Sequence, residues 1–114
     1  MYTYDVTIPR ADNHGATFPA EVIGGVESTL LDTFGGFTAT DARGAWRFDG
    51  VDYVEPVTIY RCDSLDARGK DVQRIADTFA ELLDQHEVYV PTTSPDGARD
   101  VIIGKQRDIF EDAA

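Results

Sequence analysis

Apolar and polar side chains alternate over residues 2–8, so that every second position is hydrophobic. This period of two is typical of a half-buried β-strand, which Pro9 would end. The period changes over residues 19–34, where apolar side chains recur at every fourth position. That spacing predicts an amphipathic helix, and Gly35 is placed to end it with a left-handed cap.

Residues 37–62 return to the period of two. Within them, Asp49-Gly50 is a strong signal for a tight hairpin turn. Pro56 interrupts the returning strand, since a proline cannot donate a backbone hydrogen bond. The interruption predicts a bulge, an edge position or a break between strands.

A second helix is predicted over residues 67–85, where the apolar positions follow the helical period most closely. A strand over 87–90 and a short strand over 100–104 follow it and would form a hairpin. The order is strand, helix, strand, strand, helix, strand, with one extra strand. The sequence therefore predicts an α+β fold, a ferredoxin-like βαββαβ sandwich with an extra C-terminal hairpin strand. We expect one domain over residues 1–104 and an acidic tail over 105–114.

Right-handed crossovers would place both helices on one face of the antiparallel sheet. The other face must then be covered or polar. We expect Trp46, Tyr53 and Tyr60 to line that face and to form an interaction surface. Domains of this kind often bury such a face by dimerising sheet to sheet, so the sequence predicts a homodimer.

Composition adds a strong charge signal. The 114 residues carry 21 acidic and 10 basic side chains, a formal net charge of −11. Such a surface repels nucleic acid and anionic membranes and suits a basic protein partner. Solubility, a salt-rich cytoplasm or genome composition would explain the same acidity. The one cysteine, Cys62, permits no internal disulfide, and no signal peptide is recognisable, so we expect a cytoplasmic protein.

Catalytic chemistry has few candidates in this sequence. His14 lies in a polar loop beside Asp12 and could act as a general base, although an exposed loop histidine looks the same. Tyr53 is a second weak catalytic candidate. Cys62 would need a lowered pKa to be a nucleophile, and a buried structural role is the simpler interpretation. No metal site, phosphate loop or cofactor site is predicted.

The second helix carries a row of carboxylates: Asp77, Glu81 and Asp84. A row of this kind could imitate a phosphate backbone and occupy the groove of a nucleic-acid-binding protein. A solvated helix face has the same pattern, so both interpretations stay open.

A set of turn and packing motifs begins with Phe34-Gly35-Gly36-Phe37-Thr38 and continues with Gly44-Ala45-Trp46. Tyr53, Glu55 and Tyr60 follow on the predicted strands, and Gln85 to Val90 would close the unit. Over residues 2 to 90 this pattern resembles small uncharacterised proteins of bacteria, archaea, phages and plasmids. The resemblance implies a ferredoxin-like fold and no activity.

Three functions remain open from the sequence. The first, which the sequence favours, is a non-enzymatic interaction or regulatory module, for example a viral or plasmid anti-defence protein that binds a basic nucleic-acid-binding protein. The second is a cofactor-free dimeric α+β-barrel enzyme acting on a small apolar molecule, with His14, Tyr4, Trp46 and Tyr53 as the residues to test. The third is a virion component.

Overall fold

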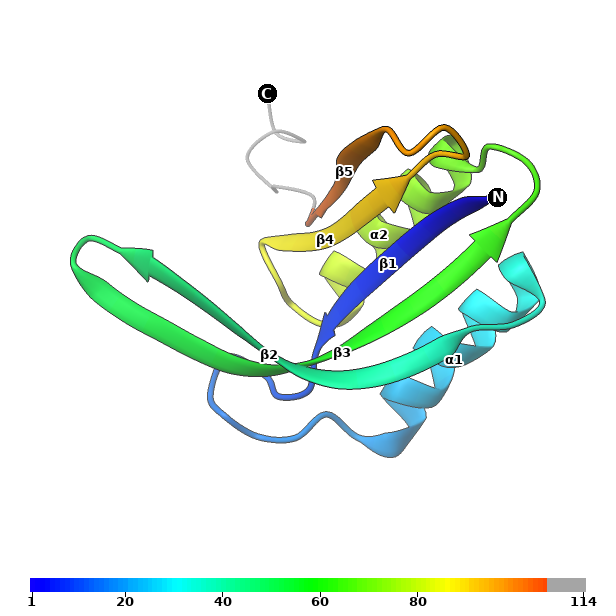
Figure 1. Cartoon of the computed structure of the whole chain (residues 1–114). Coiled ribbons are helices and arrows are strands. Elements are labelled where there is room, and N and C mark those ends of the chain that lie inside the picture. The colour runs from blue at the N-terminus through cyan, green and yellow to red at the C-terminus, as the bar shows by residue number, and fades with distance from the viewer. Residues whose placement is uncertain (107–114) are drawn as a thin grey trace, which may run out of the picture.

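The computed structural model describes residues 1–106, and within them seven elements alternate in the predicted order (Figure 1). The five strands form one antiparallel sheet in the order β2-β3-β1-β4-β5. The elements are β1 (Tyr2–Pro9), α1 (Ala20–Phe34), β2 (Thr38–Phe48), β3 (Val51–Ser64), α2 (Gly69–Leu82), β4 (Glu87–Thr93) and β5 (Arg99–Lys105).

The predicted α+β architecture is therefore confirmed in outline: two helices and an antiparallel sheet consistent with a ferredoxin-like fold. The fifth strand takes the sheet beyond the four-stranded arrangement of βαββαβ. It pairs with β4 as a hairpin, as the sequence predicted. The predicted acidic tail begins at residue 105, and from residue 107 onward it lies outside the described residues.

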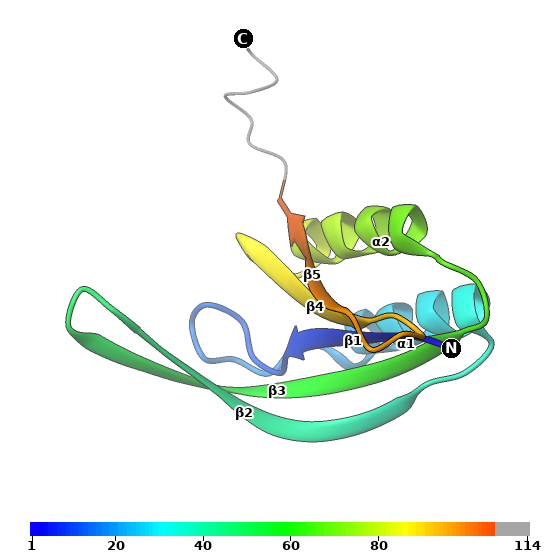
Figure 2. The ribbon, with the colours of Figure 1, turned by 45° about the horizontal axis from the view of Figure 1, so that its top comes forward.

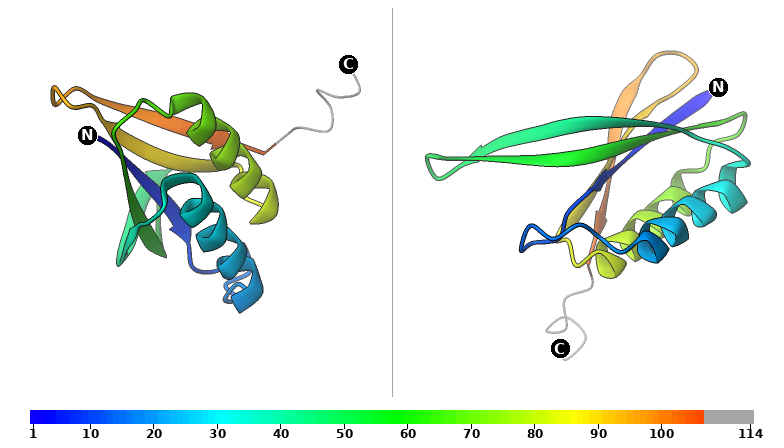
Figure 3. Two further views of the ribbon diagram at one scale, coloured as in Figure 1. Left: turned by 90° about the vertical axis from the view of Figure 1, so that its right-hand side faces the viewer. Right: turned by 90° about the horizontal axis from the view of Figure 1, so that it is seen from below.

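Both helices cover the same face of the sheet (Figures 2 and 3). The alternation in β1 turns Tyr4, Val6 and Ile8 toward them, and each of these side chains is at most 3% exposed. They join one hydrophobic core with residues of β3, β4 and the two helices, including Val26, Leu30, Val72, Phe79, Val88 and Val90. No helix of residues 1–106 lies on the opposite face of the sheet.

The first helix ends as predicted. Gly35 has φ 80°, and its N–H donates to the carbonyl of Leu31 at 2.8 Å. A residue with a side chain adopts this left-handed conformation only at a cost, so glycine suits the position. The second helix is shorter than predicted. It ends at Leu82 rather than at 85, and Asp84 turns the chain with φ 52°.

Strands β2 and β3 are longer and more continuous than the sequence suggested. They pair without interruption from Thr38↔Arg61 to Phe48↔Val51, and Asp49 and Gly50 form the turn with φ 51° and 75°. The pairing of β1 with β3 ends at Pro9↔Val57. Residues 43–56 therefore form a two-stranded hairpin that extends beyond the rest of the sheet, here called the arm (Figure 1).

Of the three alternatives predicted for Pro56, the edge position is the one observed, because the pairing of β3 with β1 ends at Val57. Pro56 neither breaks β3 nor forms a bulge. Its carbonyl accepts a hydrogen bond from the Arg10 N–H at 3.0 Å, on the side away from β2. In a strand the N–H and C=O of one residue point the same way. The missing donor would thus face the end of β1, and the pairing with β2 loses no hydrogen bond.

One prediction about the helix-free face is wrong. Tyr60 does not line that face: it is 2% exposed and belongs to the core under α1. Its hydroxyl donates to Glu27 Oε2 at 2.8 Å, and its ring lies edge-on to Phe37. The prediction failed because the continuous register of β3 places residue 60 on the same side as Val6. Trp46 and Tyr53 do lie on the helix-free side.

Neither described helix is both long enough and apolar enough to traverse a lipid bilayer.

Candidate functional site: a groove on the helix-free face

A groove of about 690 Å³ lies on the helix-free face, between the base of the arm and the start of β4. Three segments far apart in the sequence enclose it: the arm, the end of β1 with its following loop, and the turn that leads from α2 into β4. Its lining residues are Thr7, Pro9, Asn13, Gly44, Ala45, Trp46, Glu55, Val57, Gln85, His86, Glu87 and Tyr89.

The register of the arm shapes the inner wall of this groove. Gly44 lies directly opposite Glu55, and Trp46 lies directly opposite Tyr53. Because Gly44 has no side chain, the space beside Glu55 stays open. The Trp46 and Tyr53 rings stack at 5.5 Å with an angle of 12° between their planes. Trp46 remains 49% exposed, so this stack holds an indole surface at the groove.

Glu55 is the distinctive carboxylate of the groove. It is half-buried, and this burial raises the pKa of its carboxyl above the usual range, because leaving water disfavours the charged form. Glu55 is the one acidic side chain among residues 1–106 whose pKa is resolved as raised. A carboxylate of this kind gains from any cation that enters beside it.

The opposite wall adds a second carboxylate and a second aromatic ring. Tyr89 is 49% exposed, and its hydroxyl donates a hydrogen bond to Glu87, which raises the pKa of the phenol. No lysine or arginine stands among the described lining residues. In the part of the chain that the structure describes, the groove therefore offers aromatic surfaces and carboxylates without a side-chain cation to neutralise them.

The loop after β1 is held at the rim of the groove by side-chain amides. Asn13 Nδ2 donates to the carbonyl of Asp84 at 2.9 Å, and Gln85 Nε2 donates to Asn13 Oδ1 at 3.3 Å. Within the loop, Asp12 Oδ1 accepts the N–H groups of His14 and Ala16, which lowers the pKa of Asp12. The loop thus has a defined shape where it borders the site.

The weak catalytic candidates from the sequence do not meet in this groove. His14 is exposed in the loop and is not among the lining residues. The Tyr53 ring stacks on the Trp46 ring and is not among the lining residues. Tyr4 is buried on the helix side, where its hydroxyl accepts the Arg68 N–H at 2.7 Å. Of the residues named for an enzyme, only Trp46 lines the groove.

Between the helices and the centre of the sheet, side chains fill the space. The gap among Val6, Leu30 and Phe34 is too small to hold a water molecule. A pocket of the α+β-barrel kind is therefore not formed there. A smaller depression of about 300 Å³ opens at the edge, near the start of α1, where Tyr60 meets Glu27. Burial and this hydrogen bond together raise the pKa of Tyr60 far above its usual range.

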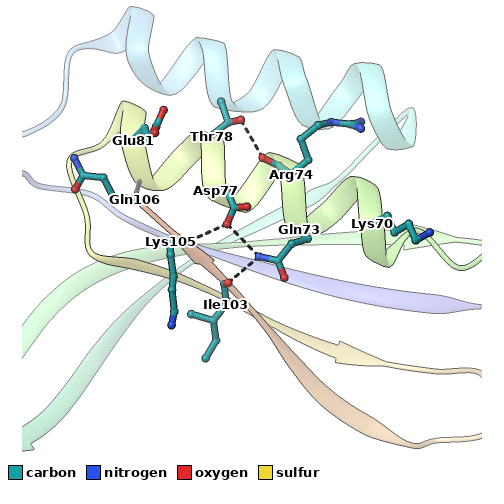
Figure 4. Close-up of a pocket in the computed structure, with 9 residues that line it drawn as sticks. All are labelled: Lys70, Gln73, Arg74, Asp77, Thr78, Glu81, Ile103, Lys105 and Gln106. Atoms are coloured by element: carbon teal, nitrogen blue, oxygen red, sulfur yellow. Dashed lines mark hydrogen bonds between the residues drawn. The ribbon is translucent and has the colours of Figure 1, made fainter. Parts of the chain in front are cut away.

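The carboxylates predicted on α2 are partly used inside the molecule (Figure 4). Asp77 Oδ1 accepts hydrogen bonds from Gln73 Nε2 at 3.1 Å and from the Lys105 N–H at 2.9 Å, so it fastens β5 to α2. Asp84 Oδ1 accepts from Gln106 Nε2 at 3.1 Å. Glu81 is exposed.

A second groove of about 690 Å³ runs along this face of α2 and mixes both signs of charge. Lys70, Arg74 and Lys105 border it, and their side chains point in different directions (Figure 4). Arg74 also pairs with Asp71 at 3.0 Å. The cations do not converge on a common point, and the face is not a uniformly acidic surface.

The structural role expected of Cys62 can be compared with its surroundings. Cys62 is fully buried, and burial raises the pKa of its thiol to about 12, which fits the structural role. Within residues 1–106, no three histidine, cysteine or acidic side chains are grouped so as to hold a metal ion.

Sequence reasoning missed Glu55, Glu87 and Tyr89 as groove residues. One signal for Glu55 was available: it stands two residues from both Tyr53 and Val57, in a row that alternates onto one face. A carboxylate in such a row is a sign of a site. The sequence held no comparable signal for Glu87 and Tyr89. They come near the arm only through the order of the strands in the sheet, which the local sequence pattern does not record.

Comparison with known proteins identifies structural neighbours only. No family model and no curated protein sequence matches the chain. A phage SAM lyase in complex with S-methyl-5′-thioadenosine superimposes with a TM-score of 0.70 at 15% sequence identity, covering 91% of this chain and 88% of that one. A phage SAM lyase in the apo state gives a TM-score of 0.69 at 13% identity, covering 94% and 90%. At this identity the likeness establishes a shared fold.

Proposed function

We propose that the groove binds a small molecule that combines a flat aromatic ring with a positive charge, and that S-adenosylmethionine is such a ligand. The observation that carries this proposal is the half-buried Glu55 beside the exposed Trp46 ring, in a groove to which residues 1–106 contribute no lysine or arginine. Aromatic faces attract both flat rings and cations. The carboxylate favours a cation, because charge pairing offsets the cost of its burial.

The structural neighbours support the same ligand class. The neighbour with TM-score 0.70 is a SAM lyase that holds S-methyl-5′-thioadenosine, the thioether left when S-adenosylmethionine loses its amino-acid chain at sulfur. In that cleavage the bond between sulfur and the amino-acid chain breaks, and sulfur keeps the electron pair. The carbon that leaves sulfur completes its bonding either with an oxygen of its own carboxylate, which closes a lactone, or by loss of a neighbouring proton, which forms an alkene. The sulfonium cation thereby becomes a neutral thioether. Glu55 would hold the charged substrate more firmly than the uncharged product.

The test compares two ligands that differ in the sulfonium charge. S-adenosylmethionine and S-adenosylhomocysteine share the adenosyl and amino-acid parts, and only the first has a positive sulfur. In titration calorimetry we expect the sulfonium to bind more tightly by a factor between about two and thirty, the range of cation–π and charge contacts. Equal affinities, or no binding of either compound at millimolar concentration, would contradict the proposal.

Substitutions of groove residues test whether the ligands bind in the groove. Glu55→Gln should remove the preference for the sulfonium while leaving the binding of S-adenosylhomocysteine nearly unchanged. Trp46→Ala should weaken the binding of both ligands. Glu81→Gln, an exposed carboxylate on α2, is the matched control and should change neither affinity. Release of S-methyl-5′-thioadenosine, followed by chromatography and mass spectrometry, separates an enzyme from a binding protein.

The interaction role predicted from the sequence has its own test. The net charge of −11 supports a basic protein partner, and the phage origin of both neighbours agrees with a viral protein. This role would be supported by capture of a basic protein whose binding weakens steeply as salt is added. Capture that does not respond to salt would remove the electrostatic argument.

A further inference from the structure

The arm exposes an unusual amount of apolar surface for a two-stranded hairpin. The exposed fractions of its large apolar side chains are 49% for Trp46, 69% for Phe48, 51% for Val51, 43% for Tyr53 and 61% for Val54. An isolated two-stranded hairpin is only marginally stable in water. Four of these side chains share the helix-free face, because Trp46 lies opposite Tyr53 and Phe48 lies opposite Val51, while Val54 alternates onto the other face. Exposed apolar surface gathered on one face marks a site of association.

Strand β2 is the outermost strand of the sheet, so one of its backbone edges pairs with no other described segment. The direction of that edge follows from Pro56, whose carbonyl points away from β2 toward Arg10. Arg43, directly opposite Pro56, must then turn its own N–H and C=O outward. By alternation, the residues of β2 whose backbone groups face the open edge are Ala39, Asp41, Arg43, Ala45 and Arg47.

We propose that this edge pairs with the same edge of a second copy of the chain, in an antiparallel arrangement with its two-fold axis at Gly44. In that register Arg43 faces the partner's Ala45, and Asp41 faces the partner's Arg47. Both are pairs of outward-facing residues, so their backbone groups can exchange hydrogen bonds. The two Gly44 residues become a close pair that exchanges none, where backbones approach to about 4.5 Å between Cα atoms.

Charge disfavours three of the neighbouring registers. A two-fold axis at Asp41 would place Asp41 opposite the partner's Asp41, and an axis at Arg43 would place Arg43 opposite the partner's Arg43. An axis at Ala45 would place Arg43 opposite the partner's Arg47. Like charges directly opposite are destabilising. The Gly44 axis instead sets two Asp41–Arg47 pairs, and Arg47 already binds Asp52 on its own chain at 2.5 Å. Each arginine would thus lie between two carboxylates.

A two-fold axis at Ala42 would also avoid pairs of like charge. The size of the opposed side chains and the net charge of the two bodies disfavour it. It would set Trp46 against Thr38 and Phe48 against Gly36, which brings the bodies of the two copies together. The arm carries two arginines and three carboxylates, so nearly all of the net charge of −11 resides outside it. The Gly44 axis centres the contact on the nearly neutral arm and the two residues of β2 just before it, and it opposes the bulky Trp46 to the small Ala42.

The charge also favours a second copy over other occupants. Nucleic acid is repelled by the acidic chain, and a strongly basic protein would be attracted to the acidic body rather than to the arm. Pairing would bring residues of the second copy to the end of each groove, since Gly44, Ala45 and Trp46 line it and lie near the axis. This dimer would form whether or not the groove binds a ligand.

Cysteine crosslinking tests the register directly. Gly44→Cys would place two thiols opposite each other, and a side chain fits there because an added Cβ meets Val57 Cγ1 at an ordinary 3.7 Å. We expect a disulfide-linked dimer on non-reducing gels after mild air oxidation. Thr40→Cys is the control: it is exposed on the same strand but would lie far from its copy. The native Cys62 is buried and should not interfere.

Charge reversal gives an independent test in solution. In sedimentation equilibrium we expect wild type to dimerise, with Asp41→Arg or Arg47→Asp weakening the dimer at least about tenfold. The double variant should restore it, and circular dichroism should confirm that each variant is folded. A wild-type monomer at all concentrations would overturn the proposal. Crosslinking through Ala42→Cys and not Gly44→Cys would overturn the register.

Discussion

Gly104 of β5 lies so close to Ala76 of α2 that a Cβ added to the glycine would come within 2.3 Å of the Ala76 carbonyl carbon. No real contact between such atoms is that short, and the obstacle is helix backbone, which cannot rotate away. The absence of a side chain at Gly104 is what allows the extra strand to pack under α2. The Asp77 bond to the Lys105 N–H fixes the same junction.

We therefore expect Gly104→Ala to lower the free energy of unfolding by about 3 kcal/mol or more, which is the upper end for overpacking. Urea denaturation followed by circular dichroism measures it. The matched control is Gly24→Ala, where an added Cβ meets nothing within 4 Å on the exposed side of α1. That change should stabilise the chain by up to about 1 kcal/mol, since alanine favours helix. A Gly104 variant as stable as wild type would contradict the packing of β5.

Removing the Tyr60 hydroxyl should cost stability, because it donates to the partly buried Glu27. Tyr60→Phe is expected to lower the unfolding free energy by about 1.5–3 kcal/mol, the range for a hydrogen bond to a charged group. Tyr53→Phe, on an exposed ring of the arm, should change it by less than about 0.5 kcal/mol. Equal effects of the two substitutions in urea denaturation would show that the Tyr60 bond does not form.

The Cys62 thiol should be inert in the folded protein. Burial raises its pKa to about 12, so almost no thiolate is present at pH 8, and the sulfur is inaccessible. Reaction with an aromatic disulfide reagent should proceed only as fast as the protein opens, and should accelerate sharply in denaturant. Rapid modification of the native chain at pH 8 would argue against the buried position.

Glu55 should make stability depend on pH in a defined direction. Because the folded state raises its pKa, the folded chain binds the proton more tightly than the unfolded chain. Its contribution is therefore favourable at low pH and is lost as pH rises from the unfolded value through the raised one. Glu55→Gln should stabilise the chain at pH 7 and leave it nearly unchanged at pH 3, where Glu55 is protonated.

Thermal denaturation across this pH range measures the Glu55 effect. Glu81→Gln serves as the control, since Glu81 is exposed, and its difference from wild type should not vary in this way. The affinity for S-adenosylmethionine should move in the opposite sense, weakening as Glu55 is protonated, while the affinity for S-adenosylhomocysteine stays constant. A Glu55 variant that is less stable than wild type at pH 7 would contradict the raised pKa.

The local elements of this protein were open to prediction because short-range periodicity encodes them. The alternation of residues 2–8, the four-residue spacing before Gly35 and the Asp49-Gly50 turn each reflect contacts within one segment. For Pro56 the sequence left a bulge, an edge position or a break open, and the structure decides for the edge position, because the pairing of β3 with β1 ends at Val57. Tyr60 misled the prediction, because a strand residue changes face with every step of the register.

The sequence by itself determined the order of the elements, the two amphipathic helices and the acidity of the surface. Only the tertiary structure decided that Glu55 and Trp46 of the arm lie across a groove from Glu87 and Tyr89 of β4, and that Gly44 leaves that groove open. Hydrophobic periodicity records which side of an element is buried. It carries no record of which distant strand becomes its neighbour, and this groove is made between such strands.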